Sequence, residues 1–378
     1  MKKVLIIGGN CQSLIRFRGE LLKRFKENKL EVYACAGTYN EPDLNWFKEL
    51  DIKFISLPFK RTTINPFNDC LFFLRLILTI KKINPDIVLA YTVKPVVYGM
   101  LASRICNVKK CHALITGLGY AFMPIKSFKH KIIYILVKFL YKISLKRIKS
   151  VIFQNHDDLN LFINQKIISK SARYVKVNGS GVDLNYFKFK KPPSIKFGIN
   201  FLLIARLLKD KGIYEYIEAA KIVRENFSKS KISFSLLGPI DTNPEAISLE
   251  DFNKFNKNKI IEYLGEVKDV RPYIEKCSVY VLPSYREGMP RSVLEAMSIG
   301  RAIITTNVPG CKETVIDGKN GYLIKKNSSK ELASAMIKFI EDNRLINEMG
   351  LYSRELANER FDVHKVNSIM LEEMDISS

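Results

Sequence analysis

The stretch Ser278-Val-Tyr-Val-Leu-Pro-Ser-Tyr-Arg-Glu-Gly-Met-Pro-Arg-Ser-Val-Leu-Glu-Ala296 joins an apolar run to an amphipathic segment through a turn that contains glycine and proline. The run predicts a buried strand, and we expect a helix over Arg291–Ile299 that Gly300 ends. Proline suits such a start because its missing N–H would have no partner in the first turn of the helix. The stretch therefore predicts a strand, a turn and a helix with free backbone N–H groups at its N-terminus.

Two carboxylates lie in this turn and helix, at Glu287 and Glu295. A helix N-terminus attracts anions such as phosphate. The two carboxylates, however, would repel a phosphate placed directly between them. They are better suited to accept hydrogen bonds from hydroxyl groups, and a nucleotide sugar offers both hydroxyls and a diphosphate. The alternative is that Glu287 is a solvated loop charge and Glu295 a surface residue of the helix.

The composition allows two globular domains, because 378 residues can form two separate cores. The seven cysteines form no C-x-x-C pair, which favours a reducing compartment. The longest apolar stretches, Leu71–Ile80 and Ile132–Tyr141, are interrupted by Arg75 and Lys138 and are shorter than the ~20 residues that span a bilayer.

The net charge of +23 is unevenly distributed. Residues 1–190 contain 33 Lys and Arg against 12 Asp and Glu, a net charge of +21, whereas residues 191–378 contain 28 against 26, a net charge of +2. A basic half can bind nucleic acid, anionic lipid or an anionic substrate, and composition does not choose among them.

Apolar runs alternate with amphipathic stretches along the chain, which predicts parallel βαβ units. The predicted strands are Val4–Ile7, Glu31–Ala36, Phe54–Leu57, Ile87–Ala90 and His112–Thr116, then Asn200–Ile204, Ile232–Leu237, Ile260–Leu264, Val279–Leu282 and Ala302–Thr305. We expect an α/β protein with two doubly wound, Rossmann-like domains facing a cleft. The domains are residues 1–190 and 191–360, separated at the linker-like Lys190–Ser194, and residues 361–378 form a helix that crosses back to the N-terminal domain.

Two further turns follow predicted strands. Gly8 and Gly9 let the backbone approach a ligand or only form a tight turn, and the nicotinamide-binding fingerprint is absent. Arg206 and Lys211 lie at a strand's carboxyl end, where open α/β sheets bind ligands, and two cations can neutralise a diphosphate without a metal. The sequence has no D-x-D motif or histidine cluster, so we expect no metal and no cofactor. The alternative for the two cations is a solvated surface loop.

These motifs together resemble the retaining glycosyltransferases of family four, which have the GT-B fold. The resemblance spans about residues 200–325 and includes Ala205-Arg-Leu-Leu-Lys-Asp-Lys-Gly212, Tyr263-Leu-Gly-Glu-Val-Lys-Asp-Val-Arg-Pro-Tyr273, the opening stretch and Asn320-Gly-Tyr-Leu-Ile324. Val93-Lys-Pro-Val-Val-Tyr-Gly99 and Ile115-Thr-Gly-Leu-Gly-Tyr120 are similar to a subgroup that builds bacterial polyprenyl-diphosphate-linked oligosaccharides. That subgroup includes α-1,3-N-acetylgalactosaminyltransferases.

The resemblance implies roles for the matching residues. Arg206 and Lys211 would hold the diphosphate of a UDP-sugar, Glu287 the sugar hydroxyls and Glu295 the ribose. The remaining donor-binding residues are expected to be Gly288, Met289, Pro290, Gly265, Val267 and Gly9. Many family members place a histidine beside the N-terminal glycine turn, where this chain has Thr116-Gly-Leu-Gly119, and the upstream His112 is expected to be a core residue. We therefore assign no general base and expect the departing phosphate oxygen to accept the proton.

A lipid-linked acceptor would explain the positive charge of residues 1–190. Lys126–Lys149 contains eight Lys or Arg, no acid and an apolar helical face, which is typical of an interfacial helix on anionic lipid. The expected membrane contacts are Lys138, Phe139, Lys142 and Lys146. The expected acceptor-binding residues are Arg16, Arg18, Lys94, Gly117 and Gly119. The alternative is a partly buried helix whose lysines extend to water.

The predicted partners are thus a nucleotide sugar, a polyprenyl-diphosphate saccharide and an anionic membrane surface, with peripheral attachment to the cytoplasmic face of the inner membrane. Two other functions remain possible for such a sequence. A nucleotide-sugar 2-epimerase shares the two-domain architecture but needs no lipid acceptor. A basic nucleic-acid-binding protein would explain the charge, but no helix-turn-helix, zinc or RNA-binding signature is present, so we expect no nucleic-acid partner.

Overall fold

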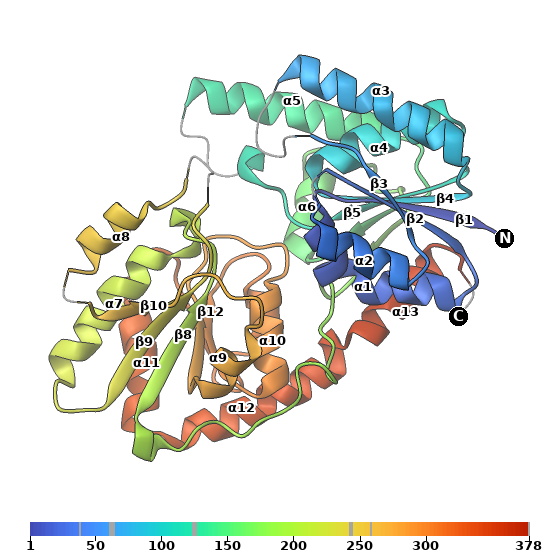
Figure 1. Ribbon diagram of the computed structural model, residues 1–378. Helices are drawn as coiled ribbons and strands as arrows, with labels where there is room; N and C mark the ends of the chain where they lie inside the picture. Colours follow the sequence, from blue (N-terminus) through green and yellow to red (C-terminus); the bar gives the residue numbers. More distant parts are fainter. Residues whose placement is uncertain (38, 60–64, 123–126, 242–244, 258, 377–378) are drawn as a thin grey trace. The chain divides into compact units, whose positions relative to one another are not determined.

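The computed structural model describes the chain except residues 38, 60–64, 123–126, 242–244, 258 and 377–378 (Figure 1). Lys126, the first residue of the basic segment, lies outside the described residues. The chain divides into two compact units. The first comprises Met1–Ser180 together with His364–Ser378, and the second comprises Gly181–Val363.

The first unit contains a seven-stranded parallel sheet in the order β3-β2-β1-β4-β5-β6-β7. Its strands are β1 Lys3–Ile7, β2 Glu31–Ala36, β3 Lys53–Ser56, β4 Ile87–Tyr91, β5 Lys110–Ile115, β6 Ser150–Phe153 and β7 Tyr174–Lys176. The order reverses between β1 and β4, which makes this a doubly wound sheet with its ligand-binding loops at the carboxyl ends of the strands.

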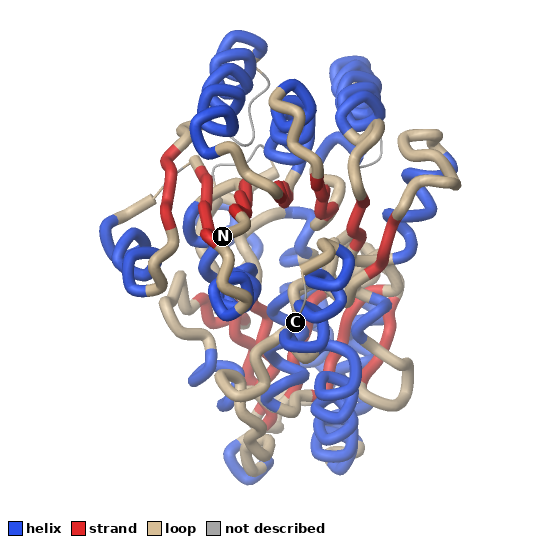
Figure 2. The backbone as a smooth tube through the Cα atoms, turned by 90° about the vertical axis from the view of Figure 1, so that its right-hand side faces the viewer, coloured by secondary structure: helices blue, strands red, loops and turns tan. Residues whose placement is uncertain are grey.

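Helices cover both faces of the first sheet (Figure 1). They are α1 Cys11–Glu27, α2 Glu41–Glu49, α3 Pro66–Ile83, α4 Val93–Ile105, α5 Phe128–Ser144, α6 His156–Asn164 and α13 Val363–Glu373. One core contains side chains from α3, α4, α5 and α6, and the other contains side chains from α1, α2 and α13. The helices and strands of these layers can be followed in the second view (Figure 2).

The second unit repeats this topology with six parallel strands in the order β10-β9-β8-β11-β12-β13. The strands are β8 Ile199–Ile204, β9 Ile232–Leu237, β10 Ile261–Tyr263, β11 Val279–Leu282, β12 Ala302–Thr306 and β13 Gly321–Ile324. The helices are α7 Ile213–Asn226, α8 Leu249–Phe255, α9 Arg271–Lys276, α10 Arg291–Ile299, α11 Ser329–Glu341 and α12 Arg344–Leu356, and a π-helical turn follows at Ala357–Phe361. Apart from β7, which only the first sheet has, the two sheets share one strand order, and this confirms the predicted α/β class.

The boundary between the units differs from the expected one. The first unit ends at Ser180 rather than at residue 190, because residues 181–190 pack on the second unit. Val182 and Phe187 lie in a core of that unit, and Lys190 N–H donates to the Ile299 carbonyl at 3.0 Å. The linker-like composition of Lys190–Ser194 therefore marks a surface segment inside the second unit.

The C-terminal helix belongs to the first unit from His364 onward. Val366, Met370, Leu371 and Met374 are buried there with residues of α1 and the sheet. The chain thus enters the second unit once and leaves it once, at residues 181 and 363.

All ten predicted strands are present, with ends that differ by up to two residues, and α10 spans the predicted Arg291–Ile299. Gly300 ends α10 with φ 89°, as expected of a left-handed cap. Pro290 lies one position before the first turn, at the N-cap. Over the described part of the chain, no helix combines the length and the apolar content needed to cross a bilayer.

Candidate functional site

Lys211 and Glu287 form an ion pair at the carboxyl edge of the second sheet. Lys211 follows β8, Glu287 follows β11, and the Lys211 Nζ lies 2.6 Å from the Glu287 Oε1. Both side chains are largely buried, with 14% and 18% of their surface exposed. These strands are neighbours in the sheet, so two predicted site residues lie together for a topological reason.

The loop that carries Glu287 is fixed from several sides. Ser284 Oγ donates to the Glu287 Oε1 at 2.8 Å, and Tyr285 N–H donates to the Asp210 carbonyl at 2.8 Å. Gly310 has φ 82°, and a Cβ there would overlap the carbonyl oxygen of Glu287. The carboxylate is therefore held by neighbouring loops as well as by Lys211, which reduces the reorganisation needed when a ligand binds.

The electrostatics of this cluster favour a charged lysine. Burial opposes the charged form of Lys211, but the charges of Glu287 and Asp210 outweigh it, so the pKa of Lys211 is raised above its ordinary value. Burial also raises the pKa of Asp210, against the influence of Lys211. The site therefore keeps a cation at the position predicted to bind a diphosphate.

Arg206 lies in the same connection after β8. Its guanidinium Nη1 donates to Asp241, and about half of the Arg206 side chain is exposed. The charge of Arg206 acts on the pKa values of both Asp210 and Lys211, so it belongs to the same electrostatic cluster. The structure thus brings the three predicted catalytic residues, Arg206, Lys211 and Glu287, to one edge of one sheet.

Glu295 lies on α10 with other partners. Arg291 Nε donates to the Glu295 Oε1 at 3.1 Å, and Arg291 Nη1 donates to the Gly181 carbonyl at 2.6 Å. Gly288 and Pro290 are in the turn before the helix, and Met289 is buried in the core under α10. The predicted donor-binding turn therefore combines a packed anchor with the backbone N–H groups of a helix N-terminus.

Gly265 and Val267 follow β10 at the same edge. Gly265 has φ 71°, and a Cβ there would meet no atom within 4 Å, so its backbone borders open space. Its carbonyl accepts from Gly238 N–H at 2.8 Å, and Val267 packs partly against the core. Gly265 and Val267, two expected donor-binding residues, therefore lie in a loop at the same edge of the sheet as Lys211 and Glu287.

The first unit presents a second set of predicted residues at its own carboxyl edge. Gly9 is buried after β1, Arg16 is exposed on α1, and Arg18 is buried with its guanidinium carbon 5.3 Å from the centroid of the Tyr91 ring. Tyr91 ends β4 and its hydroxyl lies 2.8 Å from Ser13 Oγ. The two arginines therefore have different environments, and only Arg16 extends into solvent.

Lys94 is held by an ion pair. Its Nζ lies 2.5 Å from the Asp69 Oδ1, and both side chains are mostly buried between α4 and α3. If Lys94 binds an acceptor diphosphate, its positive charge is divided between the diphosphate and Asp69. Gly117 and Gly119 follow β5 on either side of the buried Leu118, both with positive φ.

Thr92 has an unusual backbone between β4 and α4. Its φ is 69° and its ψ is 158°, a region that is essentially restricted to glycine. A β-branched residue in this region is strained, at a cost on the order of 1–3 kcal/mol. The strained residue lies two positions before the predicted acceptor residue Lys94.

His112 is buried, as the sequence predicts. Its Nδ1 lies 2.8 Å from Ser150 Oγ on the neighbouring strand, and burial lowers the pKa of His112 to about 4. The ring is therefore neutral at physiological pH and packs between strands. It has the properties of a structural residue.

The basic helix α5 carries two kinds of lysine. Lys142 and Phe139 are exposed, whereas Lys138 is only partly exposed and donates to Gln165 Oε1 at 2.8 Å. Lys146, also exposed, lies two residues after the end of the helix. The four residues expected at a membrane therefore do not share one environment, and Lys138 is turned toward the connection after α6.

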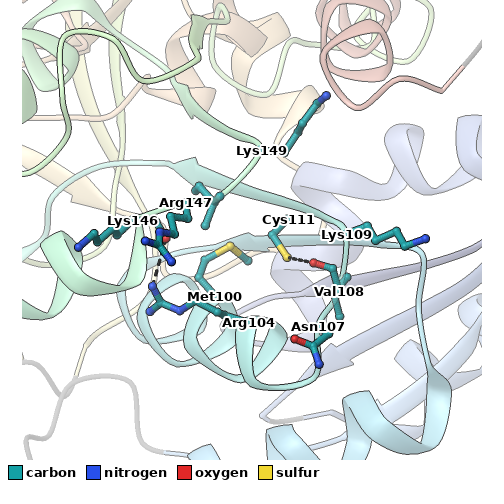
Figure 3. Close-up of a pocket in the computed structure, with 10 residues that line it drawn as sticks. Met100, Arg104, Asn107, Val108, Lys109, Cys111, Lys146, Arg147 and Lys149 are labelled. Carbon is teal, nitrogen blue, oxygen red and sulfur yellow. Dashed lines mark hydrogen bonds between the residues drawn. The ribbon is translucent and has the colours of Figure 1, made fainter.

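A basic pocket of about 260 Å³ lies at the amino edge of the first sheet (Figure 3). Arg104 donates to the carbonyls of Lys146 and Ile143 at 3.2 and 2.8 Å, so it satisfies acceptors at the C-terminus of α5. Ligands of parallel α/β sheets bind at the opposite, carboxyl edge. We therefore assign Arg104 a structural role.

Within the described ranges, no group of three or more His, Cys, Asp or Glu residues could hold a metal ion. A further charged group beside the site is Glu215, whose Oε1 accepts from the Tyr285 hydroxyl at 2.6 Å. Burial, followed by the bond to Glu215, raises the pKa of Tyr285.

Sequence reasoning did not identify several residues that shape the site. They are Asp210, Glu215, Asp241, Ser284, Tyr285 and Gly310. Asp210 and Ser284 lie inside the quoted motifs, so their proximity to Lys211 and Glu287 in sequence was an available signal. Asp241 follows β9, another carboxyl-end loop, and could have been found by the same reasoning that selected Arg206.

Comparison with known families shows that the chain is a glycosyltransferase. Residues 187–356 match the family described as glycosyl transferases group 1, and residues 22–155 match the family described as glycosyl transferase 4-like. The chain is therefore a GT-B glycosyltransferase with a 4-like domain in its first unit and a group 1 domain that covers most of its second. The sequence left both a glycosyltransferase and a nucleotide-sugar 2-epimerase possible, and the two family matches decide against the epimerase.

Two curated relatives are similar over most of their length. One is the N,N'-diacetylbacillosaminyl-diphospho-undecaprenol α-1,3-N-acetylgalactosaminyltransferase of Campylobacter jejuni, 29% identical over 344 residues and 88% of each chain. Another is the UDP-Gal:α-D-GlcNAc-diphosphoundecaprenol α-1,3-galactosyltransferase of Escherichia coli, 27% identical over 76% of this chain and 74% of the relative.

Solved structures share the fold at low identity. A glycosyltransferase from Rickettsia africae is 19% identical with a TM-score of 0.76, over 99% of this chain and 98% of that chain. HepE of Anabaena in complex with UDP is 17% identical with a TM-score of 0.77, over 99% of this chain and all of that chain. These likenesses confirm the GT-B fold.

Proposed function

We propose that this enzyme transfers an N-acetylhexosamine from a UDP-sugar to a polyprenyl-diphosphate-linked saccharide in bacterial glycan assembly. The transferred sugar that we favour is N-acetylgalactosamine, joined to the acceptor in an α-1,3 linkage. The observation that carries the proposal is the cluster of Arg206, Lys211 and Glu287 at the carboxyl edge of the second sheet. It offers two cations for a diphosphate and one carboxylate for sugar hydroxyls, held in place before any ligand binds.

The acceptor class and the linkage are supported by the two curated relatives. Each is named as acting on a diphospho-undecaprenol-linked sugar and each forms an α-1,3 linkage, whereas their named products contain different hexoses. The more similar of these two is the N-acetylgalactosaminyltransferase, which favours that donor sugar.

We propose a retaining reaction without a metal. The acceptor hydroxyl attacks the anomeric carbon on the face from which UDP departs, the bond from that carbon to the phosphate oxygen breaks, and the same phosphate oxygen takes the hydroxyl proton. Arg206 and Lys211 stabilise the negative charge that develops on the departing diphosphate. Glu287 orients the sugar and holds the Lys211 ammonium, and Glu295 binds the ribose.

The test is to incubate the purified protein with separate UDP-sugars and short polyprenyl-diphosphate saccharides, then to determine product mass by mass spectrometry and anomeric configuration by NMR. One added N-acetylhexosamine in α configuration is expected. A β product would contradict retention, transfer of another sugar would contradict the donor assignment, and sugar-nucleotide conversion without an acceptor would contradict transfer.

A further inference from the structure

Helices α3 and α5 each expose a row of large apolar side chains. On α3 the row is Phe67, Leu71, Leu74 and Leu78, which we call the outer stripe of α3. On α5 it is Phe128, Ile132, Ile135 and Phe139, the outer stripe of α5. Between 39% and 78% of each residue's surface is exposed.

The two stripes have the same spacing. Each row follows positions i, i+4, i+7 and i+11, which places its four side chains on one side of a helix. Each helix buries its other side in the core beneath it. A surface helix normally turns polar residues outward, so an outward apolar row on both helices indicates a surface that something covers.

The helices that carry the stripes lie on the same face of the first sheet (Figure 1). The helix α4 packs against both of them. Both stripes therefore lie on the layer of helices that covers one face of the first sheet.

The exposed charged residues of α3 and α5 are all basic. On α3 the exposed charged residues are Arg75, Lys81 and Lys82, because its only acid, Asp69, is buried against Lys94. On α5 no residue is acidic, and Lys129, Lys131 and Lys142 are exposed. Lys81 and Lys142 occupy the same place in each pattern, three residues after the last apolar side chain.

We infer that the outer stripes of α3 and α5 together form a two-helix surface that inserts into the interface of an anionic lipid bilayer. An apolar row flanked by cations without acids is the pattern of an interfacial helix, with anionic head groups as the complementary charge. A second copy of this chain would present the same positive charges, which disfavours it as the occupant. The inference rests on the proposed function, because a lipid-linked acceptor is presented at such a surface.

The contribution of α3 is tested with Leu74→Ser/Leu78→Ser, compared with Ile135→Ser/Phe139→Ser on α5. The matched control is Leu351→Ser, which removes an exposed leucine from α12 in the other unit. In flotation with phosphatidylglycerol-containing vesicles, each double variant should bind at least about tenfold more weakly than the parent. The control should bind like the parent, and pure phosphatidylcholine vesicles should bind all proteins weakly.

A second readout uses Cys70, an exposed cysteine on α3 beside Leu71. A polarity-sensitive fluorophore on Cys70 should shift to shorter wavelength when anionic vesicles are added. The same label in a Cys70→Ser/Leu351→Cys variant should not shift.

Parent-like vesicle binding of the α3 double variant, or an unchanged Cys70 label on bound protein, would overturn the role of α3. Dimerisation of the parent that the α3 variant abolishes would also overturn it, by showing that a second copy covers the stripe. Neither readout uses a sugar nucleotide, so failure of the proposed transfer reaction would be recognised separately, by the absence of a glycosylated lipid product.

Discussion

The ammonium of Lys211 and the carboxylate of Glu287 meet at 2.6 Å although the residues are 76 positions apart in the sequence. They meet because β8 and β11 are adjacent in the sheet and end at the same edge. In the proposed reaction one member of the pair binds the leaving group and the other the sugar. In that proposal, the ion pair contacts the donor on both sides of the bond that breaks, the bond between the sugar and the diphosphate.

Glu287→Gln, Lys211→Ala and Arg206→Ala should each reduce turnover by about a hundredfold, because each removes a contact to charge or to the sugar in the transition state. Initial rates of UDP release with saturating acceptor measure this effect. Glu218→Gln, in the exposed pair with Lys221 on α7, is the control and should retain parental activity. Near-parental turnover in all three variants, with unchanged circular dichroism, would contradict the site assignment.

Ser284→Ala should reduce turnover by about tenfold, because Glu287 loses a hydrogen bond to its carboxylate, worth about 1.5 kcal/mol. Since Ser284 acts through Glu287, the same change in the Glu287→Gln background should have little further effect on the rate. Ser334→Ala on α11 is the matched control. Additive losses in the double variant would argue that Ser284 has a separate role.

Transfer activity should persist in excess EDTA, because the diphosphate charge is met by Arg206 and Lys211. The measurement is the initial rate before and after chelation, with the protein dialysed free of divalent ions. Loss of activity that added Mg²⁺ or Mn²⁺ restores would show that the two cations are insufficient.

Thr92→Gly should stabilise the protein by about 1 kcal/mol, because glycine relieves the strained backbone of the folded state. Glycine also raises the entropy of the unfolded chain, and this offsets only part of the gain. The midpoint of urea unfolding measures the change. Thr92→Ala keeps a Cβ and should gain much less. A lower midpoint for the glycine variant would indicate that Thr92 makes compensating contacts.

Stability should fall as the pH drops from about 6.5 to 4, in part because of His112. Its pKa is about 4 in the folded protein and near 6.5 in the unfolded chain, so the unfolded chain takes up the proton first. The loss is complete near pH 4 and amounts to at most about 3 kcal/mol. Urea midpoints of the parent and of His112→Gln across this range should differ in slope, and equal slopes would exclude His112 as a source.

The sequence predicts most of the fold because its longer strands are apolar runs bounded by turns. The strands that were not predicted have weaker signals. The three residues of β7 include the partly exposed Tyr174 and Lys176, and β13 begins with Gly321, which leaves it only three apolar residues. The four-residue β6 directly follows the basic segment, whose helical pattern obscured its start.

For the site, sequence position located the cations at strand ends but did not reveal their partners. Lys94 and Lys138 were expected to face an acceptor or a membrane, yet they bond to Asp69 and Gln165, which are 25 and 27 residues away in the chain. Such pairings depend on how neighbouring helices are rotated, which the spacing of charges along one segment does not specify.

The assignment of α13 to the first unit has a consequence for how the protein is made. The second unit, residues 181–363, is continuous and is fully synthesised before the segment that supplies Met370, Leu371 and Met374 to the first core. Domains usually fold in order of synthesis, N-terminal first. Here the core that α1, α2 and α13 share lacks its α13 side chains until residue 374 has been translated. The unit whose synthesis begins first is therefore completed last.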